Sequence, residues 1–156
     1  SDVKRGDWYA PYVAFAKRYG IANGYLDGTF RPEQPVSRAE LVKLIASYFT
    51  VEGGTSPFPD VPDGHWAAEV VSFAAEEGWV SGYPDGTFRP DAPVSRAEAV
   101  KILNHALDRR AGERAAALPF TDVEKGHWAC DEIREAAVSH IYRKSGEGET
   151  WLTYER

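Results

Sequence analysis

The sequence predicts an all-α, mainly helical protein made of tandem helix-loop-helix repeats packed around a shared core. The first observation is internal repetition: residues 24–40 recur without a gap as residues 82–98, and about 25 of the 42 positions aligned around them are identical. A partial third copy starts at residues 120–128, which match residues 58–66. The second observation is a three-to-four spacing of apolar residues in each repeat, which is typical of one helical face.

We expect three units, at residues 1–50, 58–108 and 118–156, of which the third is degenerate. Units of about 50 residues bury little surface alone, so they should pack into one compact domain with a common core. The linker at residues 52–57 is rich in Gly, Ser and Pro and is therefore expected to be flexible. Residues 109–117 are rich in Ala and Arg, a composition that can extend a helix.

The first helix of a unit is predicted at residues 8–19, and at residues 66–77 in the second copy. An Asp-Gly pair follows at residues 27–28 and 85–86. This pair predicts a tight turn, because Gly tolerates positive φ and Asp bonds its own backbone. We expect the Phe two residues after each turn to fill space beneath the loop.

The second helix begins at Ser37 and Ser95, each the first residue of a Ser-Arg-Ala-Glu sequence. This sequence predicts a capping box, in which the Ser side chain accepts from a first-turn amide and Glu40 or Glu98 bonds back to the Ser amide. We therefore interpret both glutamates as structural rather than catalytic. The expected inner face is apolar at helical spacing, with Leu41, Leu44, Ile45 and Tyr48 in the first unit and Ala99, Ile102, Leu103 and Ala106 in the second.

Arg38 and Arg96 are the strongest candidates for ligand binding. Each follows the capping Ser and so lies in the first turn of a helix, where free backbone amides and the helix dipole favour an anion. A guanidinium at this place could grip a carboxylate with two parallel hydrogen bonds. The alternative is a structural ion pair between the Arg and an acidic residue of a neighbouring repeat.

Four tryptophan positions have two interpretations each. Trp8, Trp66 and Trp128 open the first helix of all three units, and this recurrence favours a core or inter-repeat contact over a platform for a sugar ring. Trp79 has an Ile as its counterpart, so repeat symmetry does not explain it. It lies beside the loop, where it could stack on a ligand ring.

The loop also carries Tyr25 and Tyr83, which suit packing and ligand contact equally well. Gly24 and Gly82 precede these tyrosines. Each Gly is either a simple turn residue or a place where a ligand touches the backbone.

The composition argues against several classes of function. The net charge of −6 argues against nucleic acid as a partner, and no run of apolar residues is long enough to predict a membrane span. His and Cys are not clustered as in a metal site, and the Asp-rich loops lack the spacing of a calcium-binding loop, so we expect no metal and no cofactor. No nucleophile elbow, phosphate-binding loop or Cys/His pairing is recognisable, so we expect no enzymatic activity.

Two further expectations concern single residue types. The lone Cys130 is interpreted as a small buried residue rather than a reactive thiol. The sequence contains no Met, so we expect it to be a piece of a longer, processed protein.

The segments FPDVPDGHWA, GYPDGTFRP and PVSRAEAV occur in this order in the second unit and again, with changes, in the first. Together they resemble the surface-layer homology (SLH) repeat of bacterial cell-surface proteins. The resemblance covers nearly all of the first two units and the beginning of the third. It is specific, because three separated motifs occur in the same order twice.

This resemblance implies a pseudo-threefold domain with a central helix bundle and ligand grooves between adjacent units. The implied function is non-covalent anchoring of an exported protein to the bacterial cell wall, outside the cell or within an S-layer. The implied partner is a secondary cell-wall polysaccharide bearing pyruvyl ketals, or amine-modified peptidoglycan in some lineages. The ligand-binding Arg of the family corresponds to Arg38 and Arg96, and the pyruvyl carboxylate is an anion of the kind expected there.

The third unit departs from this pattern after Ala137, because it lacks both the Asp-Gly loop and the Arg-Ala-Glu sequence. We therefore expect at most two competent grooves. An alternative function is a protein-docking or self-assembly module of a surface layer, in which another chain completes the third unit. The aromatic tail, with Trp151 and Tyr154, motivates this alternative.

Overall fold

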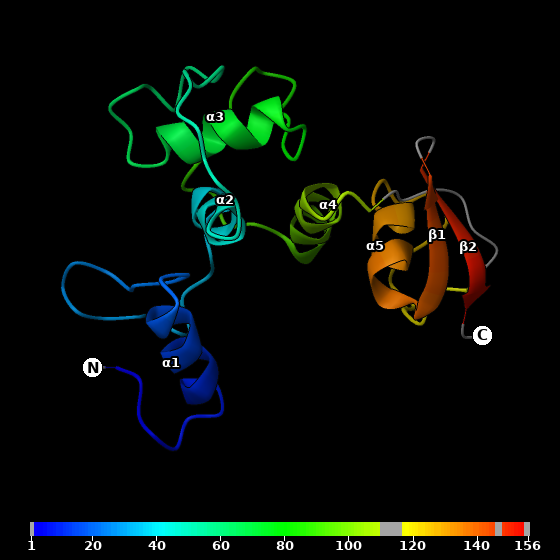
Figure 1. Ribbon diagram of the computed structural model, residues 1–156, viewed down its shortest axis with the longest axis horizontal. Helices are drawn as coiled ribbons and strands as arrows, with labels where there is room; N and C mark the ends of the chain where they lie inside the picture. The colour runs from blue at the N-terminus through cyan, green and yellow to red at the C-terminus, as the bar shows by residue number, and fades with distance from the viewer. Residues whose placement is uncertain (1, 110–116, 146–147, 155–156) are drawn as a thin grey trace.

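The computed structural model describes residues 2–109, 117–145 and 148–154. Its elements, in chain order, are α1 (Ala10–Arg18), α2 (Arg38–Ala46), α3 (Ala68–Glu76), α4 (Arg96–Ala106), α5 (Cys130–Ala137), β1 (His140–Ser145) and β2 (Gly148–Tyr154) (Figure 1). The prediction of a mainly helical fold is confirmed. In the third unit an antiparallel hairpin of β1 and β2 stands where the first two units have their second helix. The second predicted linker, at residues 109–117, lies largely outside the described residues, because positions 110–116 are not described.

The helices pack between units rather than within them. α2 packs against α3 and α4, and α4 packs against α5. α1 has no buried residue and packs against no other described helix to a comparable extent, and Figure 1 shows it set apart from α3 and α4. The implied central bundle therefore lacks its first member here. The reason is that, in the described third unit, a hairpin takes the place of the helix that would close the ring onto α1.

The core is centred on α2 and α3. Ala39, Val42 and Ala46 of α2 are almost fully buried, together with Val71 of α3 and Phe88 of the second loop. Loop residue Phe88 thus fills the space beneath the loop, as predicted. The predicted inner faces were partly wrong, since two of their members are exposed: Tyr48 and Leu103. In α2 the small residues Ala39 and Ala46 face inward, because they allow the close approach of neighbouring helices.

The interpretation of the repeated tryptophans as core residues is wrong. Trp8, Trp66 and Trp128 are 80%, 53% and 60% exposed. Two of them do make the inter-repeat contact that was the other half of that expectation. The ammonium of Lys43 on α2 lies 5.4 Å from the ring centre of Trp66, and that of Lys101 on α4 lies 6.0 Å from Trp128. Each lysine belongs to the unit before its tryptophan, so the contacts are cation–π contacts between units.

Both capping boxes form as predicted. The Oγ of Ser37 accepts from the amide of Glu40 at 3.2 Å, and the Ser37 amide donates to the Glu40 carboxylate at 2.8 Å. The same pair of bonds joins Ser95 and Glu98. Cys130 is buried, as predicted. None of the described helices is long and apolar enough to span a bilayer.

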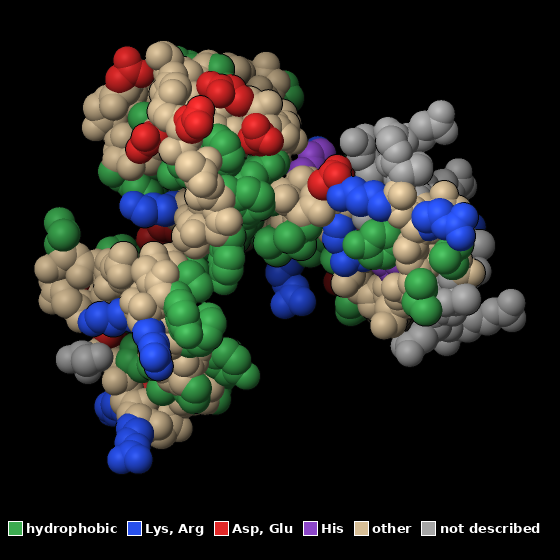
Figure 2. All heavy atoms as spheres, viewed as in Figure 1, with side chains coloured by type: hydrophobic (Ala, Val, Ile, Leu, Met, Phe, Trp, Pro, Cys, Tyr) green, Lys and Arg blue, Asp and Glu red, His purple; other side chains and the backbone are tan. Residues whose placement is uncertain are grey.

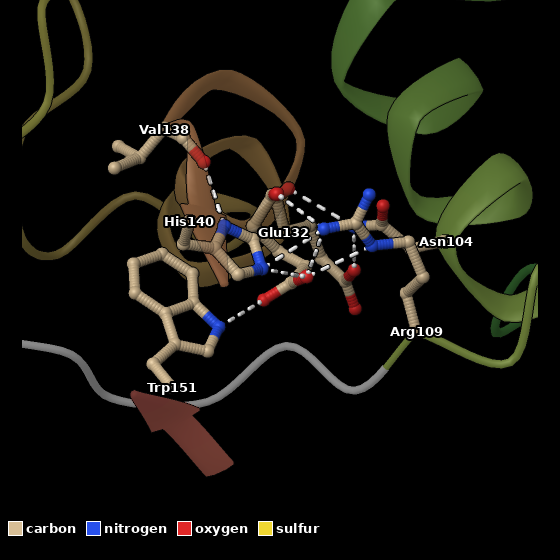
Figure 3. A network of polar contacts seen from close by, with 7 residues as sticks. Asn104, Arg109, Glu132, Val138, His140 and Trp151 are labelled. Atoms are coloured by element: carbon tan, nitrogen blue, oxygen red, sulfur yellow. Dashed lines mark hydrogen bonds and ion pairs between the residues drawn. The ribbon is translucent and has the colours of Figure 1, made fainter. Parts of the chain in front are cut away.

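The buried carboxylate of Glu135, on α5, fastens the hairpin to this helix, and Figure 3 shows its partners Arg109, His140 and Trp151. The Oε1 of Glu135 accepts from Nη2 and Nε of Arg109 at 2.7 and 2.9 Å, and its Oε2 accepts from the indole of Trp151 at 3.0 Å. The ring of His140 stacks on Trp151 with centroids 3.8 Å apart, and its Nδ1 lies 2.7 Å from the carbonyl oxygen of Val138. Because the Glu135 side chain is fully buried, these partners supply the compensation that a buried charge requires.

Candidate functional site

The start of α2 is docked on the loop of the second unit. The amides of Arg38 and Ala39 donate to the carbonyl oxygens of Ala92 and Pro90 at 2.9 and 3.0 Å. The amide of Val94 returns a bond to the first unit. The expectation that free amides at this helix start attract an anion is therefore wrong for α2, because loop carbonyls already occupy them. Any anion binding here depends on the side chain of Arg38.

The guanidinium of Arg38 is held at the joint between the two units. Its side chain is 9% exposed, and Nη2 donates to the carbonyl oxygen of Ser81 at 3.1 Å. Its centre lies 5.3 Å from the ring of Tyr83 and 4.9 Å from that of Phe88. Nη1 lies 3.7 Å from the carboxylate of Glu98, so the structural ion pair considered as an alternative is present, although it is long. The Nε of Arg38 is buried and has no hydrogen-bond partner among the described residues.

Glu98 and Tyr83 form the next layer around this guanidinium. The Tyr83 hydroxyl donates to Oε1 of Glu98 at 2.7 Å, which raises the pKa of the phenol. Burial tends to raise the pKa of Glu98, but hydrogen bonds from Tyr83 and Ser95 outweigh it, so the pKa is lowered. Glu98 therefore stays a carboxylate near neutral pH, where it closes the capping box and orients Tyr83.

The loop that receives α2 is stiffened by two aspartates. Asp60 accepts from the amides of Phe88 and Arg89 at 2.9 and 2.7 Å. Asp85 accepts from the Thr87 amide and hydroxyl and from Nη2 of Arg89, at 3.0, 2.6 and 2.8 Å. The Arg89 guanidinium in turn lies 4.0 Å from the centre of the Tyr83 ring. The backbone of Arg89 has φ of 60°, a strained conformation that these contacts hold in place.

This loop predicts an acid-sensitive fold. The hydroxyl of Thr87, and then the Arg89 guanidinium, hold the pKa of Asp85 well below its usual value of 3.8. A group with a depressed pKa contributes stability above its unfolded pKa, and that contribution is lost as the pH falls towards the folded pKa. We expect the urea midpoint to fall between about pH 6 and about pH 2.5, and to fall less steeply in Asp85→Asn. Parallel pH profiles for the two proteins would contradict this role of Asp85.

A hollow of about 380 Å³ opens beside Arg38, within the size range of small-ligand sites. Three units contribute to it: Arg38 from the first, Gly82, Tyr83 and Lys101 from the second, and Trp128 from the third. The structure thus brings together four of the predicted binding residues, since Trp79 also lines the hollow. Sequence reasoning missed Lys101 as a site residue, and for Trp128 it favoured a core or inter-repeat contact over a platform for a sugar ring. The signal that could have found Lys101 was the Lys at the same position of both second helices, Lys43 and Lys101.

Trp79 and Gly82 have packing roles in the structure. Trp79 is only 4% exposed and its ring lies 4.6 Å from Phe49 and 5.2 Å from Phe73, so it is a core residue rather than an open platform. A Cβ on Gly82 would lie 2.8 Å from the ring of Phe58. The close approach of that ring explains the glycine without a ligand.

The other predicted binding residues lie outside this hollow. The Arg96 side chain is exposed and forms no hydrogen bond or ion pair with another described residue. Gly24 lines a smaller hollow of about 180 Å³ in the first unit. Tyr25 donates to Glu40 at 2.6 Å, as Tyr83 does to Glu98, but no described arginine from another unit reaches it. The repeated residues therefore occupy unequal surroundings.

The model of the S-layer homology domain matches residues 1–42 and 57–100, which is more than half of the chain. The chain belongs to the S-layer homology family. The two matched SLH segments are the two units that contribute Arg38, Gly82 and Tyr83 to the hollow. The degenerate third SLH unit, with α5 and the hairpin, lies outside the matched segments.

The SLH chain is similar to several bacterial surface proteins. It is 35% identical to Cell surface glycoprotein 1 of Acetivibrio thermocellus over 97% of its own length, and 34% identical to the Cellulosome-anchoring protein of the same organism over 95%. It is 40% identical to an S-layer protein of Bacillus licheniformis over 68% of its length. The aligned regions span only 7%, 34% and 13% of these three relatives. The likeness therefore concerns a module within each of them.

Proposed function

We propose that this SLH domain anchors a protein non-covalently to the bacterial cell wall by binding an acidic wall glycan in the hollow beside Arg38. The observation that carries this proposal is the buried guanidinium of Arg38, which lines the hollow and keeps Nε without a hydrogen-bond partner among the described residues. A buried donor without a partner is costly, and an acceptor from a ligand would relieve that cost.

The chemistry of the lining favours a carboxylate-bearing sugar, such as a pyruvylated polysaccharide. Arg38 and Lys101 supply positive charge in a protein whose net charge is −6, so they would provide local rather than long-range attraction. A guanidinium binds a planar carboxylate with two donors. The half-exposed ring of Trp128 and the fixed ring of Tyr83 offer apolar faces on which a sugar can stack.

The named roles of the relatives support the coarser part of this proposal. A Cellulosome-anchoring protein and an S-layer protein are surface proteins by their names, which favours a location at the bacterial surface. Exoglucanase XynX of Acetivibrio thermocellus also matches, but the aligned region spans 11% of it. This small share supports a non-enzymatic, anchoring role for the module, with any catalysis in other parts of such proteins.

Co-sedimentation with purified sacculi whose secondary polysaccharide carries pyruvyl ketals tests the proposal. We expect Arg38→Lys to weaken binding at least about tenfold, because the ammonium keeps the charge but loses the planar pair of donors. Chemical removal of the pyruvyl groups should abolish binding by the unmodified protein. Circular dichroism and thermal melting establish that each variant is folded.

Arg96→Ala is the matched control, since Arg96 holds the same place in its capping box but lies outside the hollow. It should bind sacculi like the unmodified protein. Equal losses in Arg38→Lys and Arg96→Ala would rule out the hollow as the site. Undiminished binding to depyruvylated sacculi would rule out carboxylate recognition and favour peptidoglycan as the partner.

A further inference from the structure

The turn that holds Trp128 is closed by the ring of His127. Nδ1 of His127 accepts from the amide of Ala129 at 3.2 Å, and the carbonyl oxygen of His127 accepts from the amide of Cys130 at 2.9 Å. Trp128 is the residue between the two ends of the first bond, and its ring centre lies 5.7 Å from that of His127. The place of Trp128 in the lining of the hollow beside Arg38 therefore depends on this ring.

The bond from Ala129 to His127 satisfies a buried amide at the start of α5. Ala129 is the N-cap residue of this helix and has no side-chain acceptor of its own, so it forms no side-chain cap. It is fully buried, and a buried amide needs an acceptor within the protein. Nδ1 of His127 is the acceptor that the described residues provide. Losing it would leave the amide unsatisfied, which is costly in a buried position.

This bond exists only while the His127 ring is neutral. Nδ1 can accept from an amide only through its lone pair, so the hydrogen bond assigns the proton of the neutral ring to Nε2. A proton taken up from water at Nδ1 makes both ring nitrogens donors, and the new N–H would then face the N–H of Ala129. Histidine is the side chain that ordinarily changes charge between about pH 5 and about pH 8.

The surroundings of His127 offer little to a protonated ring. His105 and His140 each lie within 3.4 Å of a carboxylate, but His127 has no ion pair with any described carboxylate. Lys101 already lies 6.0 Å from the ring centre of Trp128, and a positive charge at the start of α5 would oppose the helix dipole. On the face shown in Figure 2, Lys and Arg side chains gather over the lobe that contains α5 and the hairpin. The charged groups on the segments around His127 are Glu124 and Lys125 of its own loop, Lys101 of α4, and Asp131, Glu132 and Arg134 of α5.

We propose that His127 is a positioning residue, whose neutral ring holds Trp128 in place for an acidic wall glycan and whose protonation releases it. A protonated ring cannot accept from Ala129, so the turn opens and the hollow loses the indole face on which a sugar stacks. Binding to the wall therefore weakens as the pH falls from about 7.5 to about 5. This proposal rests on the proposed glycan function, because Trp128 lines the hollow that was assigned to the glycan.

The second unit supplies a matched control at His65. Nδ1 of His65 accepts from the amide of Ala67 at 3.1 Å, in the same turn before α3. The tryptophan of that turn, Trp66, lines neither of the two hollows. An Asn side chain can keep such a bond without titrating, because a side-chain oxygen in this chain already makes one: Oδ1 of Asp85 accepts from the amide of Thr87, two residues on, at 3.0 Å.

Co-sedimentation with pyruvylated sacculi at about pH 7.5 and about pH 5 compares the unmodified chain with His127→Asn and His65→Asn. We expect the unmodified chain and His65→Asn to bind about three- to tenfold more weakly at the lower pH, which is the effect of one lost hydrogen bond. His127→Asn should bind like the unmodified chain at the higher pH and keep most of that affinity at the lower. His127→Ala, which has no acceptor, should bind weakly at both, and thermal melting shows whether it is folded. His105 and His140 are present in every variant, so their titration cancels in the comparison.

NMR without glycan separates failure of this proposal from failure of the proposed function. Long-range ¹H–¹⁵N correlations should show the His127 ring with its proton on Nε2 at about pH 7.5, and the Trp128 indole signal should shift with the titration of that ring. Parallel binding profiles for the unmodified chain and His127→Asn, or an indole signal that does not follow the ring, would overturn the positioning role and leave Arg38-dependent binding intact. If no variant binds sacculi at the higher pH, the glycan function fails, and the indole signal alone decides whether His127 positions Trp128.

Discussion

Replacing Phe88 by Ala is expected to lower the free energy of unfolding by about 3–5 kcal/mol, the range for buried Phe-to-Ala substitutions. The Phe88 side chain is fully buried beneath the second loop. Its ring lies 5.4 Å from that of Phe58 and 4.9 Å from the Arg38 guanidinium, so the substitution leaves a cavity and removes the floor under the arginine. Urea unfolding followed by tryptophan fluorescence measures the loss.

Phe30→Ala is the control that the repeat itself supplies. Phe30 occupies the same place in the first loop, but it is only half-buried and no helix start from another described unit is docked over it. The loss should therefore be less than half of that for Phe88→Ala, since the cavity term scales with the space that stays enclosed. Equal losses would show that the two loops are equivalent in solution, contrary to the packing described above.

Replacing Glu135 by Ala is expected to cost about 3–5 kcal/mol, as for other buried ion pairs from which one partner is removed. The substitution leaves Arg109 and the Trp151 indole without their shared acceptor. The hairpin has few other buried contacts with α5, so we expect it to detach before the rest of the domain unfolds. Hydrogen exchange of the hairpin amides and urea unfolding together measure this effect.

Glu69→Ala provides the comparison, because Glu69 is an exposed acidic residue in the first turn of α3. It should cost less than about 1 kcal/mol, the usual range for an exposed charge near a helix start. Glu135→Gln keeps the shape of the side chain and one acceptor. Its loss of unfolding free energy should therefore lie between those of Glu69→Ala and Glu135→Ala. A loss below about 1 kcal/mol for Glu135→Ala would mean that the network adds no net stability.

Features that depend on neighbouring residues were predictable from the sequence. The capping boxes at Ser37 and Ser95 and the turns before Phe30 and Phe88 follow from short-range chemistry, which is the same in both copies. The resemblance to the SLH repeat also implied that a groove would combine residues of adjacent units. Arg38 does lie beside Gly82 and Tyr83, as that expectation required.

Features that depend on long-range packing were not predictable. Identical motifs gave no sign that Arg38 would be buried while Arg96 stayed exposed, because the difference comes from the loop that the next unit supplies. The sequence placed Trp79 near a ligand, whereas Phe49 and Phe73 draw it into the core. The network around Glu135 joins a linker, a helix and a hairpin, and no periodic pattern links these segments.

The docking of α2 on the second loop also sets the direction in which this chain can assemble. The helix start that donates from Arg38 and Ala39 comes earlier in the chain than its acceptors, Pro90 and Ala92. The joint between the first two units is therefore complete as soon as the second loop has emerged. A polypeptide delivered N-terminus first can build this joint while later residues are still arriving, because the second loop closes on a helix that is already in place.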